Sequence, residues 1–291
     1  MTKLKKKAIV ALSGAGALWS TAALADQPTP WQWRFQPAVT EIMEGIIWFE
    51  IYTLWFIVPI TLLVLGLLAW CMIRYRETAN PNPSRTSHNT AIEVIWTLGP
   101  VLVLLALAVP SFQLLTAQYT PPEEAGLTIK ATGNQWNWDY EYQVGEEGLS
   151  FNAAVLTEAD RAANGKEDLA KYPRLLATDN DVVVPVNMTV RVLVTASDVL
   201  HAFAMPAFGI KVDAVPGRIN ETWFKATKEG IYYGQCSELC GKDHAYMPIA
   251  IRVVSAEQYE TWYAAALADL PAANKALMAS IETDNKLAAA E

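Results

Sequence analysis

The sequence has few charged residues, a deficit of basic ones and only three cysteines. Charged residues make up 18% of the 291 positions and hydrophobic residues 52%, so apolar side chains must be concentrated in particular segments. The chain carries 22 basic and 30 acidic residues, and the net charge of −8 argues against binding nucleic acid. No internal repeat is present. Cys71 lies in an apolar run, where it is expected to pack, which leaves Cys236 and Cys240 for chemistry.

Residues 1–25 have the organisation of a secretory signal peptide. Four lysines within the first seven positions precede an apolar stretch from Ala8 to Trp19, and Ala23-Leu24-Ala25 forms a small-x-small cleavage site. A short membrane anchor is the alternative, but the apolar stretch is too short to cross a bilayer comfortably. Cleavage removes four lysines and no acid, which changes the net charge from −8 to −12.

Two long apolar runs predict a transmembrane hairpin over residues 46–118, with helices at about 48–74 and 92–116. The runs cover residues 51–73 and 94–115. Each is long enough, at about 1.5 Å per residue, to cross a hydrocarbon layer of about 30 Å. A pair of helices buried in a soluble core is the alternative.

The charges around the hairpin predict its orientation. Arg74, Arg76 and Arg85 lie in the connecting loop, which the positive-inside rule places in the cytoplasm. Signal cleavage places an arm, residues 26–45, outside, and two crossings return the chain to that side. We therefore expect a protein of the bacterial inner membrane, with a large C-terminal domain in the periplasm.

The remaining sequence predicts an all-β sandwich or barrel. Residues 127–132, 181–195 and 249–254 are rich in β-formers and have the pattern of strands, and glycines mark the turns between others. Ser255 begins a predicted helix that extends to residue 268, so the domain covers residues 119–268. Residues 269–291 are expected to form a frayed C-terminal tail.

A compact group of soft donors is the most informative feature of the domain. Cys236, Cys240, His244 and Met247 lie within twelve positions, and a second histidine lies 35 positions before Cys236, at His201. Thiolate, imidazole and thioether together favour copper. Two bridging thiolates, one histidine per metal, axial Met247 and the axial backbone carbonyl of Glu238 would complete a dinuclear copper site.

Three other sites remain open for the same residues. A disulfide between Cys236 and Cys240 would leave both histidines and Met247 unexplained. Structural zinc rarely uses methionine. A mononuclear blue-copper site needs only one cysteine.

Several motifs resemble subunit II of the haem–copper cytochrome c oxidases. They are Gly133-x-Gln-Trp-x-Trp138, Tyr140-Glu-Tyr142, Asp198-Val-Leu-His201, Val215-Pro-Gly-Arg218 and the segment from Tyr233 to Pro248 that carries the donors. The resemblance extends from about Trp48 to Trp262. It implies a cupredoxin fold and a dinuclear copper centre, called CuA, at the donors named above.

The resemblance also implies roles for residues outside the copper site. Trp136 would receive the electron, and Glu141, Asp179 and Asp198 would belong to an acidic patch for a basic cytochrome c. Alternation along the strand would place Trp136 on one face with Trp138, Tyr140 and Tyr142. The family usually has histidine at Asn134 and an aromatic residue at Asn137, so local details of docking are in question.

Two glutamates acquire implied roles at other places. The side chain of Glu238 would help to bind magnesium at the boundary with the catalytic subunit. Glu93 would lie at the cytoplasmic entrance of a proton pathway, although a glutamate in a first helical turn also suits the helix dipole.

The resemblance predicts a membrane-anchored electron-entry subunit that passes electrons to haem in subunit I, where oxygen is reduced to water with proton pumping. Three histidines are too few for this chain to hold the catalytic site itself. Other subunits and membrane lipid are further expected partners. The alternatives are a quinol oxidase subunit, which would lack the copper ligands, a CuA subunit of another respiratory reductase, and a copper chaperone.

Overall fold

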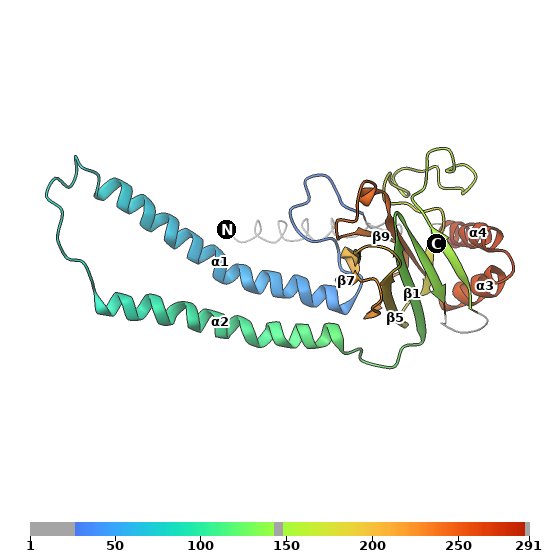
Figure 1. Cartoon of the computed structure of the whole chain (residues 1–291), viewed down its shortest axis with the longest axis horizontal. Helices are drawn as coiled ribbons and strands as arrows, with labels where there is room; N and C mark the ends of the chain where they lie inside the picture. The colour runs from blue at the N-terminus through green and yellow to red at the C-terminus, as the bar shows by residue number, and fades with distance from the viewer. Residues whose placement is uncertain (1–26, 143–147, 289–291) are drawn as a thin grey trace, which may run out of the picture.

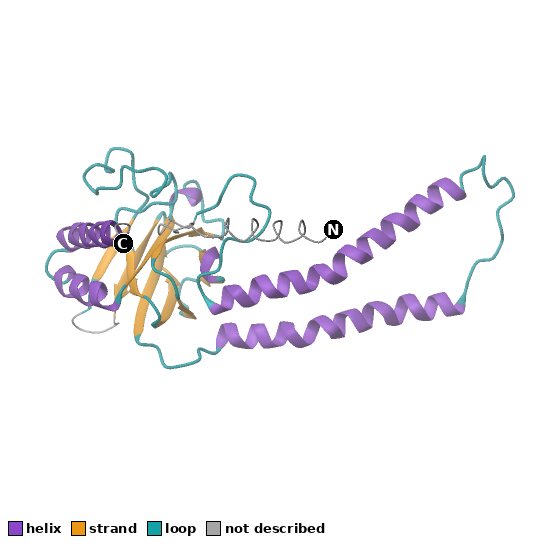
Figure 2. Cartoon of the chain, turned by 180° about the vertical axis from the view of Figure 1, so that it is seen from behind, coloured by secondary structure: helices purple, strands orange, loops and turns teal. Residues whose placement is uncertain are grey.

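The computed structural model describes residues 27–142 and 148–288, so the predicted signal peptide lies outside the described residues. Two long helices, α1 and α2, run side by side away from a β domain at one end (Figure 1). Strands gather in that domain, and two shorter helices, α3 and α4, cover its far side (Figure 2). The predicted fold class, a two-helix hairpin followed by a β-sandwich, is confirmed.

The hairpin helices are longer than predicted. Helix α1 covers Glu41–Arg74 and α2 covers Thr90–Tyr119. Helix α1 begins early because the Thr40 side chain caps it, accepting a hydrogen bond from the Met43 N–H while donating one to the Phe208 carbonyl of the β domain. The predicted arm, residues 26–45, therefore ends too late, since its last five residues are helical.

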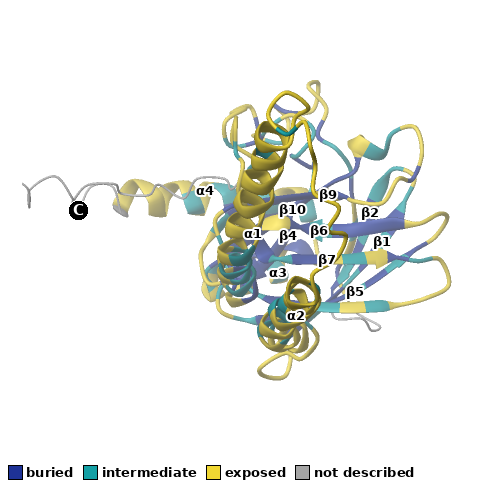
Figure 3. Cartoon of the chain, turned by 90° about the vertical axis from the view of Figure 1, so that its left-hand side faces the viewer, coloured by how far each residue is buried: buried dark blue, intermediate teal, exposed yellow. Residues whose placement is uncertain are grey.

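Most residues of both hairpin helices are exposed within this chain (Figure 3). Many of these exposed residues are large and apolar. The most apolar 18-residue segments of α1 and α2 have mean hydropathies of 2.6 and 2.3, and no residue of either segment is buried within this chain. Cys71 is exposed on α1, so the packing role predicted for it is not met within this chain. At about 1.5 Å per residue the helices measure about 51 and 45 Å, which exceeds a hydrocarbon layer.

The β domain is a sandwich of two five-stranded sheets. One sheet has the order β3-β2-β1-β5-β8, and the other has the order β4-β10-β9-β6-β7. The strands are β1 (Leu127–Asn134), β2 (Asn137–Tyr142), β3 (Ser150–Ala153), β4 (Val182–Pro185), β5 (Thr189–Ala196), β6 (His201–Met205), β7 (Ile210–Ala214), β8 (Asn220–Lys225), β9 (Gly230–Cys236) and β10 (Pro248–Val254).

The single strand predicted over residues 181–195 is wrong. The segment forms β4 and β5, which belong to opposite sheets. The chain crosses between them at Asn187, whose φ of 60° turns the backbone through the left-handed region that asparagine tolerates better than most residues. Valine-rich composition is favourable in both strands, so the pattern did not reveal the break between them.

A buried charge cluster joins the segment before β4 to the second sheet. Asp181 accepts hydrogen bonds from Lys166, at 2.7 Å, and from Arg252 of β10, and all three side chains are almost fully buried. Burial opposes ionisation of Asp181, but the two cations outweigh it and lower the pKa of this carboxyl. The cluster attaches the long 154–181 segment, which contains little regular structure, to the sandwich.

The C-terminal tail is not frayed, so that prediction is wrong over its described part. Helix α3 (Ala256–Ala266) begins at Ser255 with a capping box, as predicted, and α4 (Leu270–Ala288) folds back along it. Leu277 of α4 is buried, and the indole N–H of Trp262 donates to the Asn274 side chain at 2.8 Å. Helix α4 therefore belongs to the domain core.

We expect the β domain to lose stability in acid because of Asp181. Its native pKa is below the ordinary value of 3.8, so its contribution to the free energy of unfolding is complete above about pH 4 and disappears as pH falls through the native pKa.

Asp181→Asn should lower the free energy of unfolding by about 3–5 kcal/mol at neutral pH, because Lys166 and Arg252 stay buried without a counter-charge. Urea unfolding followed by near-ultraviolet circular dichroism measures both effects. The control, Glu221→Gln in the exposed pair with Arg191, should change little.

Helix α4 supplies a second test, because it carries matched buried and exposed leucines. Leu277 is 6% exposed and Leu287 is 63% exposed. Leu277→Ala should lower the free energy of unfolding by about 2–4 kcal/mol through lost burial and a cavity, and Leu287→Ala should have little effect. Equal small effects in the same unfolding measurement would contradict the packing of α4 on the domain.

Candidate metal centre

The pairing of β6 with β9 brings His201 to Cys236, although 35 positions separate them. Phe203 of β6 is paired with Cys236 of β9, so the last residue of β9 and the first of β6 lie at the same end of the sheet. The opposite sheet contributes Gly133, where a Cβ atom would lie only 3.0 Å from the His201 ring. Close approach of that ring therefore requires glycine in the Gly133-x-Gln-Trp motif.

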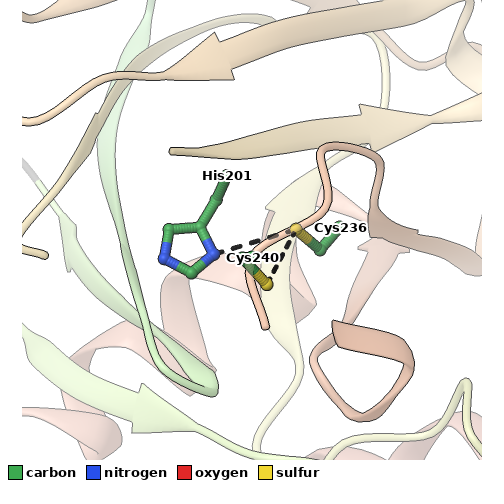
Figure 4. Close-up of side chains that lie close together, drawn as sticks. All are labelled: His201, Cys236 and Cys240. Carbon is green, nitrogen blue, oxygen red and sulfur yellow. Dashed lines mark hydrogen bonds between the residues drawn. The ribbon is translucent and has the colours of Figure 1, made fainter. Parts of the chain in front are cut away.

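The loop after β9 folds the remaining donors around the first two. The Cys236 and Cys240 sulfurs lie 3.9 Å apart, and the Nδ1 atom of His201 is 3.8 Å from Cys236 Sγ (Figure 4). Cys240 Sγ in turn lies 3.4 Å from His244 Nδ1 and 3.5 Å from Met247 Sδ. The Glu238 carbonyl lies 3.3 Å from Cys236 Sγ. All five predicted side chains and this carbonyl are thus brought together.

The donors form two similar halves. Cys236 lies beside one imidazole, His201, and one weak donor, the Glu238 carbonyl. Cys240 lies beside another imidazole, His244, and another weak donor, the Met247 thioether. Two thiolates between two such sets suit a pair of soft metal ions, so the donor chemistry fits copper.

The geometry weighs against the other sites considered for these residues. The two sulfurs are far beyond the disulfide bond length of about 2.05 Å. His244 approaches Cys240, but it lies outside the group formed by the donor atoms of His201, Cys236 and Cys240, which are all within 4.8 Å of one another. A single tetrahedral zinc, with bonds of about 2.0–2.3 Å, would need all four donor atoms in one such group.

Most of the site is buried in the domain. His201 is fully buried, and Cys236, Cys240 and Met247 are buried. His244 is half-buried, so it is the most exposed of the five donor side chains. Burial and the neighbouring Cys236 raise the pKa of the Cys240 thiol to about 12. A metal that binds here must therefore displace the proton of Cys240.

Asp198 and Gln135 hold the candidate donors in position, a role that the sequence alone did not predict for either residue. Asp198 lies 2.9 Å from His201 Nε2, which leaves Nδ1 facing the sulfur. Burial opposes ionisation of Asp198, but hydrogen bonds from His201, Val199 N–H and Gln135 N–H lower its pKa. Gln135 also donates its side-chain amide to the Cys240 carbonyl at 2.7 Å. The position of Gln135 within the Gly133-x-Gln-Trp motif is the sequence feature that could have pointed to this role.

The aromatic residues around the site divide into core and surface. Trp138, Tyr140 and Tyr142 are buried along β2, as alternation predicts, but Trp136 precedes the strand and is half-buried. A Cβ atom on Gly241 would lie 3.1 Å from the Trp136 ring, so this indole packs against the residue that follows Cys240. Trp136 is thus at the outer edge of the donor cluster.

The three predicted docking acids already have partners within the chain. Glu141 pairs with Lys130 at 2.6 Å, and Asp179 accepts from the Ala154 and Asn180 backbone N–H groups. Asp198 supports His201. None of the three is fully buried, but only Asp198 is shown in contact with a candidate metal donor.

The two remaining predicted residues lie in different places. The Glu238 side chain is exposed on the donor loop. Glu93 lies in the first turn of α2, four residues after the Asn89 cap, at the end of the hairpin far from the β domain (Figure 1). The structure therefore separates the predicted proton-pathway residue from the metal donors by the length of the helix.

Comparisons with known proteins cover both halves of the chain. The family described as cytochrome c oxidase subunit II, periplasmic domain, matches residues 127–254. The family described as cytochrome c oxidase subunit II, transmembrane domain, matches residues 28–114. Neither match includes α4.

Individual relatives agree with these matches. A probable cytochrome c oxidase subunit 2 of Rickettsia bellii is 45% identical over 258 residues, covering 89% of this chain and 92% of the relative. Cytochrome c oxidase subunit 2 of Oenothera berteroana is 43% identical, covering 84% and 94%. The periplasmic domain of cytochrome oxidase subunit II (CoxB) of Bradyrhizobium japonicum has 54% identity over 50% of this chain and 95% of that one, with a TM-score of 0.43. The chain belongs to the cytochrome c oxidase subunit II family.

Proposed function

We propose that this chain is the electron-entry subunit of a cytochrome c oxidase, with His201, Cys236, Cys240, His244, Met247 and the Glu238 carbonyl as copper ligands. Electrons would arrive from reduced cytochrome c and leave for haem in the catalytic subunit, where oxygen is reduced to water with proton pumping. The single observation that carries the proposal is the pairing of each thiol with one imidazole and one weak donor.

Membership of the family fixes the setting of this function. The chain is a subunit of a haem–copper oxidase, which is an oxidoreductase complex. Its two membrane-spanning helices and periplasmic domain place it in the bacterial inner membrane, with the donor cluster on the outer side.

The residues of the site suit a centre that must change oxidation state with little movement. When bound, the two coppers would supply a one-electron redox centre shared over both metals. The chain contributes donors from a rigid β core, and Asp198 and Gln135 hold His201 and the donor loop from outside. Such support keeps the donor atoms at fixed positions through repeated electron transfer.

Trp136 is the proposed point of electron entry. Its half-buried indole packs on Gly241, which directly follows Cys240 in the chain. It therefore connects the surface of the domain with the donor loop. The Gln135 side chain, bound to the Cys240 carbonyl, holds the tryptophan's own backbone to the same loop.

The remaining roles follow from the family and are also proposals. Glu141, Asp179 and Asp198 would contribute to an acidic docking patch, and such patches raise the rate of encounter more than the affinity. The exposed Glu238 carboxylate suits a magnesium ion shared with the catalytic subunit. Glu93 would begin a proton pathway on the cytoplasmic side.

A copper chaperone is the second candidate function, but the burial of the donors does not favour it. His201 and both thiols lie inside the domain core, and only His244 is at the exposed edge. A protein that hands over its metal needs donors that a partner can reach. We therefore expect bound copper to exchange slowly.

Copper binding is tested directly by comparing substitutions of Cys240, in the candidate site, and Cys71, on the hairpin. The wild-type chain should bind two coppers and give an electron spin resonance pattern from one electron shared by two equivalent nuclei. Cys240→Ser should lose that pattern, because one bridging thiolate is gone. Cys71→Ser, on the hairpin, should keep it. One copper per wild-type chain, or copper removed readily by a chelator, would contradict the dinuclear site and favour the chaperone.

The role of Trp136 is tested by Trp136→Phe in the assembled oxidase. We expect kcat/KM for reduced cytochrome c to fall by about tenfold or more, equivalent to at least about 1.4 kcal/mol of barrier. Copper content and spectrum should stay unchanged, because no donor atom is removed. The measurement is the steady-state rate over a range of salt, and a rate equal to wild type would argue against entry through this residue.

A further inference from the structure

The N-terminal arm, residues 27–40, exposes aromatic side chains that the function above does not use. Trp31 is 98% exposed, Trp33 87% and Phe35 51%. Apolar rings so completely in water within one short segment are unusual for a soluble surface. They need a surface outside this chain.

The arm is held in place at three points. The Gln27 side chain donates to the Ala170 carbonyl, and the Val39 backbone bonds to Ala207 and Thr227 in the β domain. Between these ends, Arg34 pairs with Glu50 of α1 at 2.9 Å. The arm is therefore a strap along the first turns of α1, on the side away from α2 (Figure 1).

The ion pair places the arm at the level of the membrane surface. Helix α1 ends on the cytoplasmic side at Arg74, and about 20 helical residues cross the hydrocarbon layer. Counting back from Arg74, the layer ends near Leu54, and Glu50 lies about 6 Å beyond it. Trp33 and Phe35, on either side of Arg34, are thus beside the headgroup region of the outer leaflet.

The segment around Trp31 forms a tight turn. The Gln32 N–H donates to the Thr29 carbonyl at 3.1 Å across Pro30 and Trp31, and Trp31 has a φ of 63°. Proline followed by a residue of positive φ is the pattern of a type II turn, so the turn itself accounts for the left-handed backbone of Trp31. Within the described chain nothing buries the ring that this turn carries.

We propose that this arm is an interfacial anchor that inserts Trp31, Trp33 and Phe35 into the outer lipid surface. Tryptophan is enriched at that depth of bilayers, where an apolar ring with one polar edge is favourable. The only formal charge on residues 27–40 is Arg34, which Glu50 neutralises. The arm can therefore enter the headgroup region without exposing an unpaired charge to lipid, and it would limit rocking of the β domain over the membrane.

The test is made in the complete oxidase, reconstituted in phosphatidylcholine nanodiscs. A genetically encoded fluorescent residue replaces Trp33, and nitroxide lipids with a shallow or a deep label act as quenchers. We expect the shallow label to quench position 33 at least about twofold more than the deep label, because the arm lies at headgroup depth. Position 169, an exposed leucine of the β domain, is the control and should be quenched by neither.

A charge exchange separates anchoring from simple proximity. Arg34→Glu should release the arm and lower quenching at position 33, and combination with Glu50→Arg should restore it. Absence of quenching at position 33 in the complete oxidase would overturn the proposal. That result would place the arm in water or under a neighbouring subunit, even if the isolated chain were quenched.

Discussion

The antiparallel pairing of β6 with β9 is the interaction on which the donor cluster depends. It sets His201 against Cys236, and every other donor comes from the loop that continues β9. A slip of one residue in this register would turn His201 to the opposite face of its sheet and remove one imidazole from the site. Because β6 and β9 lie inside a five-stranded sheet, the register is held by neighbours on both sides.

Trp138 connects the packed core of the domain with the candidate donors. Its ring packs edge-on against both His201 and Phe203, and its indole N–H lies 3.4 Å from the Met247 carbonyl. One buried side chain of the first sheet thus contacts the two parts of the second sheet that carry donors. A rigid sandwich is therefore a suitable scaffold for the proposed copper site, since packing within the domain already positions the candidate donors.

The structure also decides how the domain sits on its hairpin. The Thr40 cap and the close contact of Gly209 with Met43 and Ile46 join α1 directly to the β domain, without a flexible linker. The donor cluster is therefore kept at a fixed height above the membrane. The arm, attached at both ends to the domain and in its middle to Glu50, supports the same junction from the side.

The sequence by itself determined the two helices, the β class of the domain and the set of candidate donors that the fold brings together, because each depends on local pattern. Apolar length predicts a membrane span, and soft donors at short spacing predict copper. Only the tertiary structure decided that residues 181–195 divide between two sheets, that α4 packs on α3, and that Asp198 and Gln135 support the metal donors. These features depend on contacts between segments distant in the chain, and hydrophobic periodicity contains no information about which partner a segment will meet.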